Sequence, residues 1–414
     1  MASPKNSRKD KPMLPLDDVR VVEIDNWMAA PSAAAILADM GADVIKIEPL
    51  TGDPMRNTMR PPKLPEHLQE YDYQFDVDNR GKRSISVDLE SPEGTAIVHR
   101  LCEEAQVFVC NLLAHRQAKF GLDPKSLLAV NPGIVHATLT GYGTVGPDAW
   151  RPGYDVTAFF GRSGLYDAMR EGPDGPVPMA RPAQGDHTTG LSLVGAVLGA
   201  LRLAERSGKG QVVETSLYET AVWTQATDFA VTAMDRAPLP PRARHNLIIA
   251  TANRFPCGDG KWLVLNMPEA SAFAKLCRLI GKDEWIEEER FADIRSRFRN
   301  MPEIVAGIDE ALSAKGRDEW GEIFDANGVI WGPVLGLHEV ANDPQAEALG
   351  MFPPIEHPEM GPYRSVAMPM KFKTADVGPR SPAPLLGEHT REVLAESGMS
   401  DEQVDALIVA GVIR

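Results

Sequence analysis

The sequence has few cysteines, and their spacings are not those of a zinc site or a disulfide framework. Its four cysteines lie far apart in a chain of 414 residues, without a CxxC pair. This scatter excludes a zinc framework and a disulfide framework, and it fits a reducing, cytoplasmic setting. No H-x-x-x-H pattern is present either, so no metal site is expected. The cysteines are Cys102, Cys110, Cys257 and Cys277.

Long apolar runs and excess positive charge are also lacking. No run approaches the ~20 residues that span a bilayer, so membrane insertion is not expected. The basic start "MASPKNSRKDK" lacks the following apolar segment of ~7–15 residues that a secretory signal needs, and residues 1–13 are interpreted as a flexible tail. A formal net charge of −15 would repel a phosphodiester backbone, which argues against nucleic acid as the partner.

The first strand-to-helix turn, from Asn26 to Pro31, contains no glycine. Without glycines the backbone cannot approach a pyrophosphate as it does in dinucleotide-binding turns, so NAD is not expected. The chain has no GxSxG motif either, and the catalytic triad of the α/β-hydrolases is therefore not indicated.

Strands and helices nevertheless alternate along the first half of the chain. The apolar segments 19–24 and 43–48 flank a helix predicted to open at Pro31 and to stop at Gly41, which gives a β-α-β unit. Another helix, with Ser91 as its N-cap, precedes further strands. This alternation predicts an α/β fold with a Rossmann-like parallel sheet covered on both faces.

The length predicts two domains. Three prolines, Pro238, Pro240 and Pro241, stiffen the chain and remove backbone donors, and we interpret residues 226–239 as a linker. Beyond it, "CGDGKWLVLNM" predicts a hairpin and amphipathic helices follow, so residues 240–335 form the smaller, α+β domain. A capping box of Ser400 with Gln403 predicts a helix near the end of the chain.

Asp186, in "RPAQGDHTTG", is the first candidate for chemistry. Aspartate is a preferred N-cap, and a long apolar helix follows, so a structural role as a cap is one interpretation. The other is a nucleophile, because helix-start donors favour the ionised carboxylate and an ionised carboxylate can attack a carbonyl. The small neighbours Gly185 and Gly190 would leave room for a substrate.

Three further features each allow two interpretations. The segment "NRGKRS" could hold phosphate groups or form a solvated charged turn. Tyr154 and Asp155 end a glycine-rich stretch that could line a ligand site, or Asp155 could cap the next helix. His187 could transfer protons beside Asp186, or it could be an ordinary polar loop residue.

Taken together, these stretches resemble the class III CoA-transferases, the family of formyl-CoA transferase and carnitine CoA-transferase. The similarity covers nearly the whole chain. It is carried by "MAAPSAAAILADMGADVIKIEP", "GDPMR", "NRGKRSISVDLESPEG", "NPGIVHATLTGYG", "RPGYD", "GDHTTG", "ERSGKGQVVETSLYETA" and "PLLGEHT".

The resemblance implies that Asp186 is the nucleophile, forming an aspartyl anhydride and then an aspartyl-CoA thioester as CoA passes from an acyl-CoA to a carboxylic acid. It implies a large domain of residues 14–225 that the chain re-enters over 336–414, with the smaller domain between. It also implies two interlocked subunits that form a homodimer. The residues implied to contact CoA are Trp27, Met28, Ala29, Asn111, Lys119, Tyr154 and Asp155, with Arg80, Lys82 and Arg83 near the adenosine phosphates.

Two alternatives stay open. The racemase branch of the family, which inverts 2-methylacyl-CoA, carries a histidine in "GHD", whereas this chain has Gly153-Tyr154-Asp155, which favours transfer. A CoA-binding subunit without catalysis is the other alternative, and the presence of Asp186 speaks against it. The chain also departs from many relatives at Pro49 and around Asn111. It lacks a glycine run in the small domain, so specificity for formyl or oxalyl groups is not supported.

Overall fold

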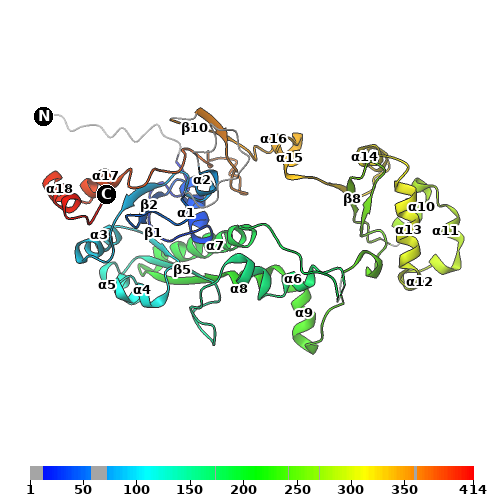
Figure 1. Cartoon of the computed structure of the whole chain (residues 1–414), viewed down its shortest axis with the longest axis horizontal. Helices are drawn as coiled ribbons and strands as arrows, with labels where there is room; N and C mark the ends of the chain where they lie inside the picture. The colour runs from blue at the N-terminus through cyan, green and yellow to red at the C-terminus, as the bar shows by residue number, and fades with distance from the viewer. Residues whose placement is uncertain (1–12, 57–71, 173, 241, 270, 359–360) are drawn as a thin grey trace. The chain divides into compact units, whose positions relative to one another are not determined.

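The computed structural model describes residues 13–56, 72–172, 174–240, 242–269, 271–358 and 361–414 (Figure 1). The predicted tail, residues 1–13, lies outside this range except for Met13. The chain divides into two compact units. The larger comprises residues 1–165, 180–229 and 347–414, and the smaller comprises residues 166–179 and 230–346.

The larger unit contains a six-stranded sheet in which every neighbouring pair is parallel. Its order, β3-β2-β1-β4-β5-β6, is that of a doubly wound Rossmann sheet. The predicted α/β fold is thereby confirmed. The strands are β1 (Arg20–Ile24), β2 (Asp43–Glu48), β3 (Arg83–Ser86), β4 (Val107–Cys110), β5 (Val135–Thr140) and β6 (Gln211–Ser216).

One face of this sheet is apolar. Because side chains alternate along a strand, Val22 and Ile24 face the same side, as do Ile45 and Ile47 of β2. All four are buried in one cluster with side chains of α3 (Pro92–Glu103), α5 (Pro124–Val130), α17 (Thr390–Glu396) and α18 (Asp401–Val409).

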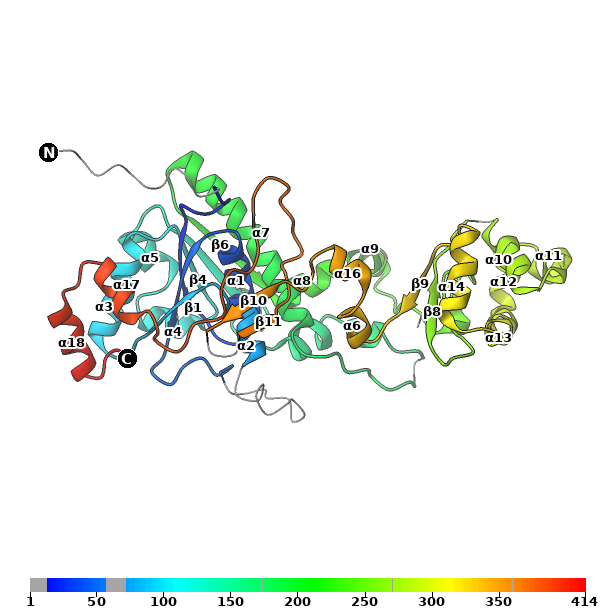
Figure 2. The same ribbon diagram turned by 90° about the horizontal axis from the view of Figure 1, so that it is seen from above.

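The opposite face is covered by α1 (Ala29–Asp39) and α7 (Gln184–Ser207), which pack against each other, and α7 also packs against β5 and β6 (Figures 1 and 2). In the described part of the chain, α7 is the one helix long and apolar enough to cross a membrane, which the sequence prediction overlooked. Its contacts with α1 and the sheet are those of a core helix.

The end of the chain covers the edge strand β3. The backbone N–H of His389 donates to Ser84 O (2.9 Å), that of Arg414 donates to Ser86 O (3.2 Å), and Ile413 forms an antiparallel bridge with Val87. The remaining elements of this unit are α2 (Tyr73–Asn79), α4 (Ala114–Lys119), the π-helix η2 (Asp155–Gly161), α8 (Leu217–Thr224), β10 (Pro354–His357) and β11 (Gly361–Arg364).

The smaller unit is built on a three-stranded antiparallel sheet, β7-β8-β9, packed with helices around its own buried core. The predicted hairpin is confirmed, since β7 pairs with β8. The elements are β7 (Arg254–Pro256), β8 (Trp262–Leu265), β9 (Trp331–Val334), α10 (Ala272–Ile280), α11 (Glu284–Glu287), α12 (Ile294–Arg299), α13 (Met301–Leu312), α14 (Arg317–Ala326), α15 (Leu337–Val340), and the 3₁₀ turns η3 (Arg244–Asn246) and η4 (Glu289–Phe291).

The region between the units differs from the prediction. A helix, α9 (Ala226–Asp235), occupies most of the predicted linker 226–239. It can form because residues 226–237 contain no proline. Pro241 lies outside the described residues. The smaller unit also takes in residues 166–179 and extends to 346 rather than 335. Two short helices lie at unit boundaries, α6 (Leu165–Ala168) and α16 (Pro344–Ala348).

Two helix caps were predicted well. The Ser91 side chain accepts a hydrogen bond from Gly94 N at the start of α3. Ser400 and Gln403 form the capping box of α18. In both cases the chemistry is confined to four consecutive residues, which is why local sequence sufficed.

Candidate active site

Two asparagines connect the carboxyl ends of β1 and β4 by hydrogen bonds. These two strands are neighbours at the point where the strand order of the sheet reverses. Asn111, which follows β4, donates from Nδ2 to Asn26 O (2.8 Å), and Asn26 N donates back to Asn111 Oδ1 (3.2 Å). In open α/β sheets ligands bind at this reversal point, outside the carboxyl ends of the strands. Asn111, predicted to contact CoA, therefore also fixes the loop that follows β1.

That loop contains a backbone outlier at Trp27. Its φ of 68° lies in the left-handed region, which costs a non-glycine residue about 1–2 kcal/mol. The Trp27 ring meets Tyr154 edge to face, with ring centroids 5.7 Å apart. The Tyr154 side of this pair is open, since Tyr154 is 55% exposed. Met28 and Ala29, which follow, are buried at the start of α1.

A buried lysine pairs with carboxylates in and beside this loop. The Lys46 side chain is fully buried, and its Nζ lies 3.0 Å from Asp25 Oδ1 and 3.1 Å from Asp53 Oδ2. The other carboxylate oxygen of Asp53 accepts hydrogen bonds from Trp27 N (3.3 Å) and Met55 N (2.8 Å). Burial alone would lower the pKa of the Lys46 ammonium, but the surrounding carboxylates outweigh it and raise that pKa.

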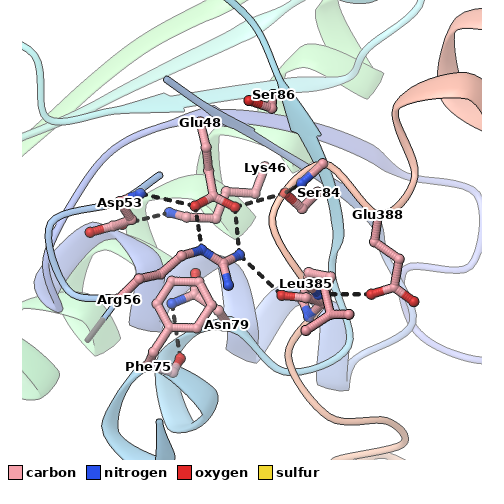
Figure 3. Close-up of polar contacts among 12 residues, drawn as sticks. Lys46, Glu48, Asp53, Arg56, Phe75, Asn79, Ser84, Ser86, Leu385 and Glu388 are labelled. Carbon is pink, nitrogen blue, oxygen red and sulfur yellow. Dashed lines mark hydrogen bonds and ion pairs between the residues drawn. The ribbon is translucent and has the colours of Figure 1, made fainter. Parts of the chain in front are cut away.

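A second ion pair, between Arg56 and Glu48, lies beside the first (Figure 3). It also contacts the C-terminal part of the chain, at Pro384. Arg56 donates to both oxygens of Glu48, each at 2.7 Å, and from Nη2 to Pro384 O (3.0 Å). Glu48 also accepts from Ser84 Oγ (2.7 Å) and Asp53 N (3.0 Å). Such bidentate, charge-assisted pairs fix geometry, so this one fixes the loop between β2 and Arg56.

Asp186 lies in the first turn of α7. Of the two interpretations of Asp186, the N-cap is wrong, because the helix begins two residues earlier, at Gln184. The N-cap is Ala183, in the left-handed region with φ 77°, and it makes no side-chain cap bond. Ala183 and Trp27 both pack against the buried cluster of Met28, Met55 and Phe75, which brings the start of α7 to the loop after β1.

Two glycines allow this close packing. A Cβ added at Gly185 would lie 2.6 Å from Phe159 Cγ and 2.9 Å from Asp155 Cβ, so the start of α7 lies directly on η2. One added at Gly190 would lie 2.2 Å from Ser32 Oγ in α1. From the sequence, these glycines were expected to leave room for a substrate. In the structure they instead let neighbouring chain segments pack closely.

The carboxyl group of Asp186 is not held ionised by its helix start. Burial, followed by the charges of Asp155 and Asp78, raises its pKa to about 7, while His187 acts in the opposite direction. Donors in the first turn favour the charged form by only about 0.3–2 kcal/mol. Desolvation and two neighbouring carboxylates outweigh that contribution, so the expectation of a permanently ionised Asp186 needs correcting.

Asp155 begins η2 and is buried (3% exposed). Its Oδ1 accepts from Val156 N (2.6 Å). Its Oδ2 has no hydrogen-bond partner among the described residues. A buried acceptor left without a donor is costly, and it marks a place where a ligand N–H would be favoured.

His187, next to Asp186, is partnered rather than free. Its Nε2 lies 3.0 Å from Oδ1 of Asp78, a buried residue near the end of α2. Burial lowers the pKa of the imidazole, but the hydrogen bond and charge of Asp78 outweigh it, and the net effect raises that pKa.

The three cations of "NRGKRS" are bound by carboxylates of the chain. Arg80 Nη2 lies 2.8 Å from Asp39, Lys82 Nζ 2.7 Å from Glu23, and Arg83 Nη2 2.7 Å from Asp43. Arg80 and Lys82 are buried, which also contradicts a solvated charged turn. Their side chains are committed to the fold, so the structure offers no free cluster of cations here for phosphates.

Lys119 lies elsewhere, at the end of α4. It is exposed, pairs with Glu90, and approaches the Phe120 ring with Nζ 5.2 Å from the ring centroid.

Among the described residues, no group of three or more His, Cys, Asp or Glu could hold a metal ion.

A family model described as CoA-transferase family III matches residues 16–390. The chain belongs to this family. This match confirms the family resemblance noted in the sequence. It spans the loop after β1, η2 and the start of α7.

Curated relatives align with this chain over nearly their whole length. The (R)-2-hydroxy-4-methylpentanoate CoA-transferase of Clostridioides difficile is 30% identical over 400 residues, covering 96% of this chain and 99% of that protein. The succinate–glutarate CoA-transferase of Agrobacterium fabrum is 33% identical over 389 residues, covering 92% and 95%. The crystal structure of a CAIB/BAIF family protein from Brucella suis has a TM-score of 0.80 at 32% identity, covering 93% and 99%.

Sequence reasoning missed Lys46, Asp53 and Asp78. The first had a usable signal, since a lysine inside the apolar strand "DVIKIE" of a sheet covered on both faces must find buried partners. Asp53 and Asp78 carry no comparable local signal, because the contacts that bring them to the site, with Trp27 and His187, span 26 and 109 residues of chain.

Proposed function

We propose that this protein transfers CoA from an acyl-CoA to a carboxylic acid, with Asp186 as the nucleophile. The observation that carries the proposal is the position of Asp186, in the first turn of α7 beside the loop after β1, in a chain that belongs to CoA-transferase family III. The relatives described above are named as CoA-transferases that act on organic acids, which supports the same reaction class.

In the first half of the proposed reaction, the Asp186 carboxylate attacks the thioester carbonyl. A C–O bond forms, the C–S bond breaks, and CoA leaves as its thiolate. The thiolate then attacks the Asp186 carbonyl of the anhydride, releasing the first acid as a carboxylate and leaving CoA as a thioester on Asp186. The acceptor carboxylate follows the same two steps in reverse, and no net proton or electron is exchanged.

Several residues are proposed to bind the CoA substrate at this edge of the sheet. The open face of the Trp27 and Tyr154 pair offers an apolar surface. The unpartnered Asp155 Oδ2 would accept an N–H from one of the two amide groups of the pantetheine arm. Met28, Ala29, Asn111 and Lys119 remain proposed contacts. Arg80, Lys82 and Arg83 are not proposed as phosphate ligands through their side chains.

The proposal is tested by trapping the intermediate. The protein is incubated with succinyl-CoA and hydroxylamine, and the peptide that contains Asp186 is analysed by mass spectrometry for a hydroxamate. Wild-type protein should form it, and Asp186→Asn should not. Transfer activity should fall by at least about 1,000-fold in Asp186→Asn, while Asp18→Asn, which changes an exposed aspartate, should behave as wild type.

A panel of acyl-CoA donors and acids identifies the substrate. It should include 2-hydroxy acids and dicarboxylates, the classes in the names of the relatives. If no donor labels Asp186, and a 2-methylacyl-CoA instead exchanges its α-proton with deuterated water, the racemase alternative replaces transfer. Binding of CoA with neither reaction would support the non-catalytic subunit.

We also propose that two copies of the chain associate, as the family resemblance implies. Light scattering of the purified protein should then give about twice the chain mass of 45.1 kDa. A single-chain mass across micromolar concentrations would contradict a dimer.

A further inference from the structure

The backbone and the ring of His187 are both fixed. The backbone N–H donates to Ala183 O (2.9 Å), which places His187 in the first turn of α7. At the other end, the ring lies 3.0 Å from Asp78 Oδ1. Because a carboxylate only accepts, Nε2 carries the hydrogen of this bond. The imidazole is thus anchored next to Asp186 by a segment of chain more than 100 residues away.

Asp186 lies in a negative environment. The charged groups that act on it among the described residues are Asp155 from η2, Asp78 from α2, and His187 from its own helix. Arg80, which follows α2, acts on His187 and is itself paired with Asp39. Two of the three groups around Asp186 therefore repel a carboxylate, and His187 is the one that attracts it.

The pair of His187 with Asp78 changes this balance. A buried Asp78 without a partner would add its full repulsion to that of Asp155, since the charge is poorly screened away from water. When the imidazole is protonated, its charge 3.0 Å from Asp78 Oδ1 offsets part of the Asp78 charge and attracts the Asp186 carboxylate. The nucleophile of the proposed reaction must be a carboxylate, because a protonated acid cannot attack a thioester.

We propose that His187, held by Asp78, is a positioning residue that increases the fraction of Asp186 in its nucleophilic carboxylate form before the acyl-CoA binds. This inference rests on the proposed function. It assigns Asp78, the residue before "NRGKRS", a task in the site, in place of the phosphate binding suggested by the cations that follow.

The decisive measurement needs no substrate. Asp186 is titrated in the free protein by ¹³C NMR with aspartate labelled at the carboxyl carbon, and its signal is assigned by its absence in Asp186→Asn. In His187→Gln the apparent pKa of Asp186 should rise by about 0.5–1 unit, because a cation is lost. His99→Gln, which removes a histidine of α3 on the apolar face of the sheet, should leave it unchanged.

Kinetics give an independent measurement. With succinyl-CoA as donor and glutarate as acceptor, the acid limb of kcat/KM in His187→Gln should move to higher pH by the same amount, with the rate near wild type at pH 9. A purely structural role would lower the rate at every pH. An unchanged Asp186 titration in folded His187→Gln overturns the inference, even if wild-type transfer confirms the proposed function.

Asp78→Asn tests the pairing itself. In this variant the imidazole of His187, followed by ¹³C-labelled histidine, should titrate at lower pH than in wild type, because it loses a negative partner. An unchanged His187 titration would show that Asp78 does not hold the imidazolium and would overturn the proposed arrangement. Failure of the proposed function is read separately, from the absence of an Asp186 hydroxamate in wild-type protein.

Discussion

Gly190 of α7 lies so close to Ser32 of α1 that no side chain fits at position 190. A Cβ at Gly190 would lie 2.2 Å from Ser32 Oγ, and 2.9 Å from Ala29 O. This contact sets how deeply the start of α7, with Asp186, enters the site.

We therefore expect Gly190→Ala to destabilise the protein by about 1–3 kcal/mol through overpacking, although alanine favours helices. Urea unfolding measures the effect. Adding Ser32→Ala removes the nearest atom and should recover part of the loss, whereas Ser32→Ala alone gives the baseline. Equal losses with and without the serine would show that the contact with Ser32 is not the cause.

Asp186→Asn should stabilise the protein at alkaline pH while abolishing transfer. The pKa of Asp186 is about 7 in the folded chain, against 3.8 in the unfolded chain. Between these values the folded chain binds more protons, so the wild-type free energy of unfolding falls as pH rises from about 4 to 7. Asparagine does not titrate, and the variant escapes this loss.

The gain in the free energy of unfolding should reach about 2–4 kcal/mol at pH 8 and shrink towards zero near pH 4. The urea midpoints of both proteins at pH 4.5 and pH 8 measure it. A difference that does not depend on pH would mean that Asp186 is not desolvated as the structure indicates.

Lys46→Met should cost about 3–5 kcal/mol in the free energy of unfolding, because it leaves the buried carboxylates Asp25 and Asp53 without their cation. Lys119→Met is the matched control. Lys119 pairs with Glu90 at the surface, where both side chains are more than half exposed, and the expected change is below about 1 kcal/mol. Similar effects of both variants would contradict the structural role of Lys46.

The four cysteines should be unreactive in the native protein. All are buried, and burial raises the pKa of each thiol, to about 11 for Cys257 and about 12 for Cys102, Cys110 and Cys277. Thiolate is the reactive form, so 5,5′-dithiobis(2-nitrobenzoate) at pH 8 should label none of them until denaturant is added. Rapid labelling of one thiol in the native protein would show that its surroundings open to solvent.

The strands and two caps were predictable because their signals are local. Ser91 and Ser400 bond within four residues, and β1 and β2 are marked by apolar runs with a proline and a glycine between them. The parallel order of the sheet follows from the alternation of strands and helices.

The start of α7 was not predictable in the same way. An aspartate before an apolar run resembles an N-cap, but the helix starts earlier because Ala183 adopts a left-handed conformation, which its sequence neighbours do not indicate. The cations of "NRGKRS" show the same limit. A charged turn and a buried set of ion pairs have the same letters, and only the partners distinguish them: Asp39, Glu23 and Asp43 lie 40 to 59 residues upstream.

The cover over β3 has a consequence for how this chain is made. β3 ends at Ser86, yet its partners Gly387 and His389 lie some 300 residues later, and the smaller unit is synthesised in between. On the ribosome, the edge of the sheet therefore stays exposed until residues 384–414 have emerged, and the smaller unit has its complete core first. A pause late in synthesis would leave an open strand edge, the feature that most readily pairs with other chains, so chaperone binding to nascent chains should be strongest over this interval.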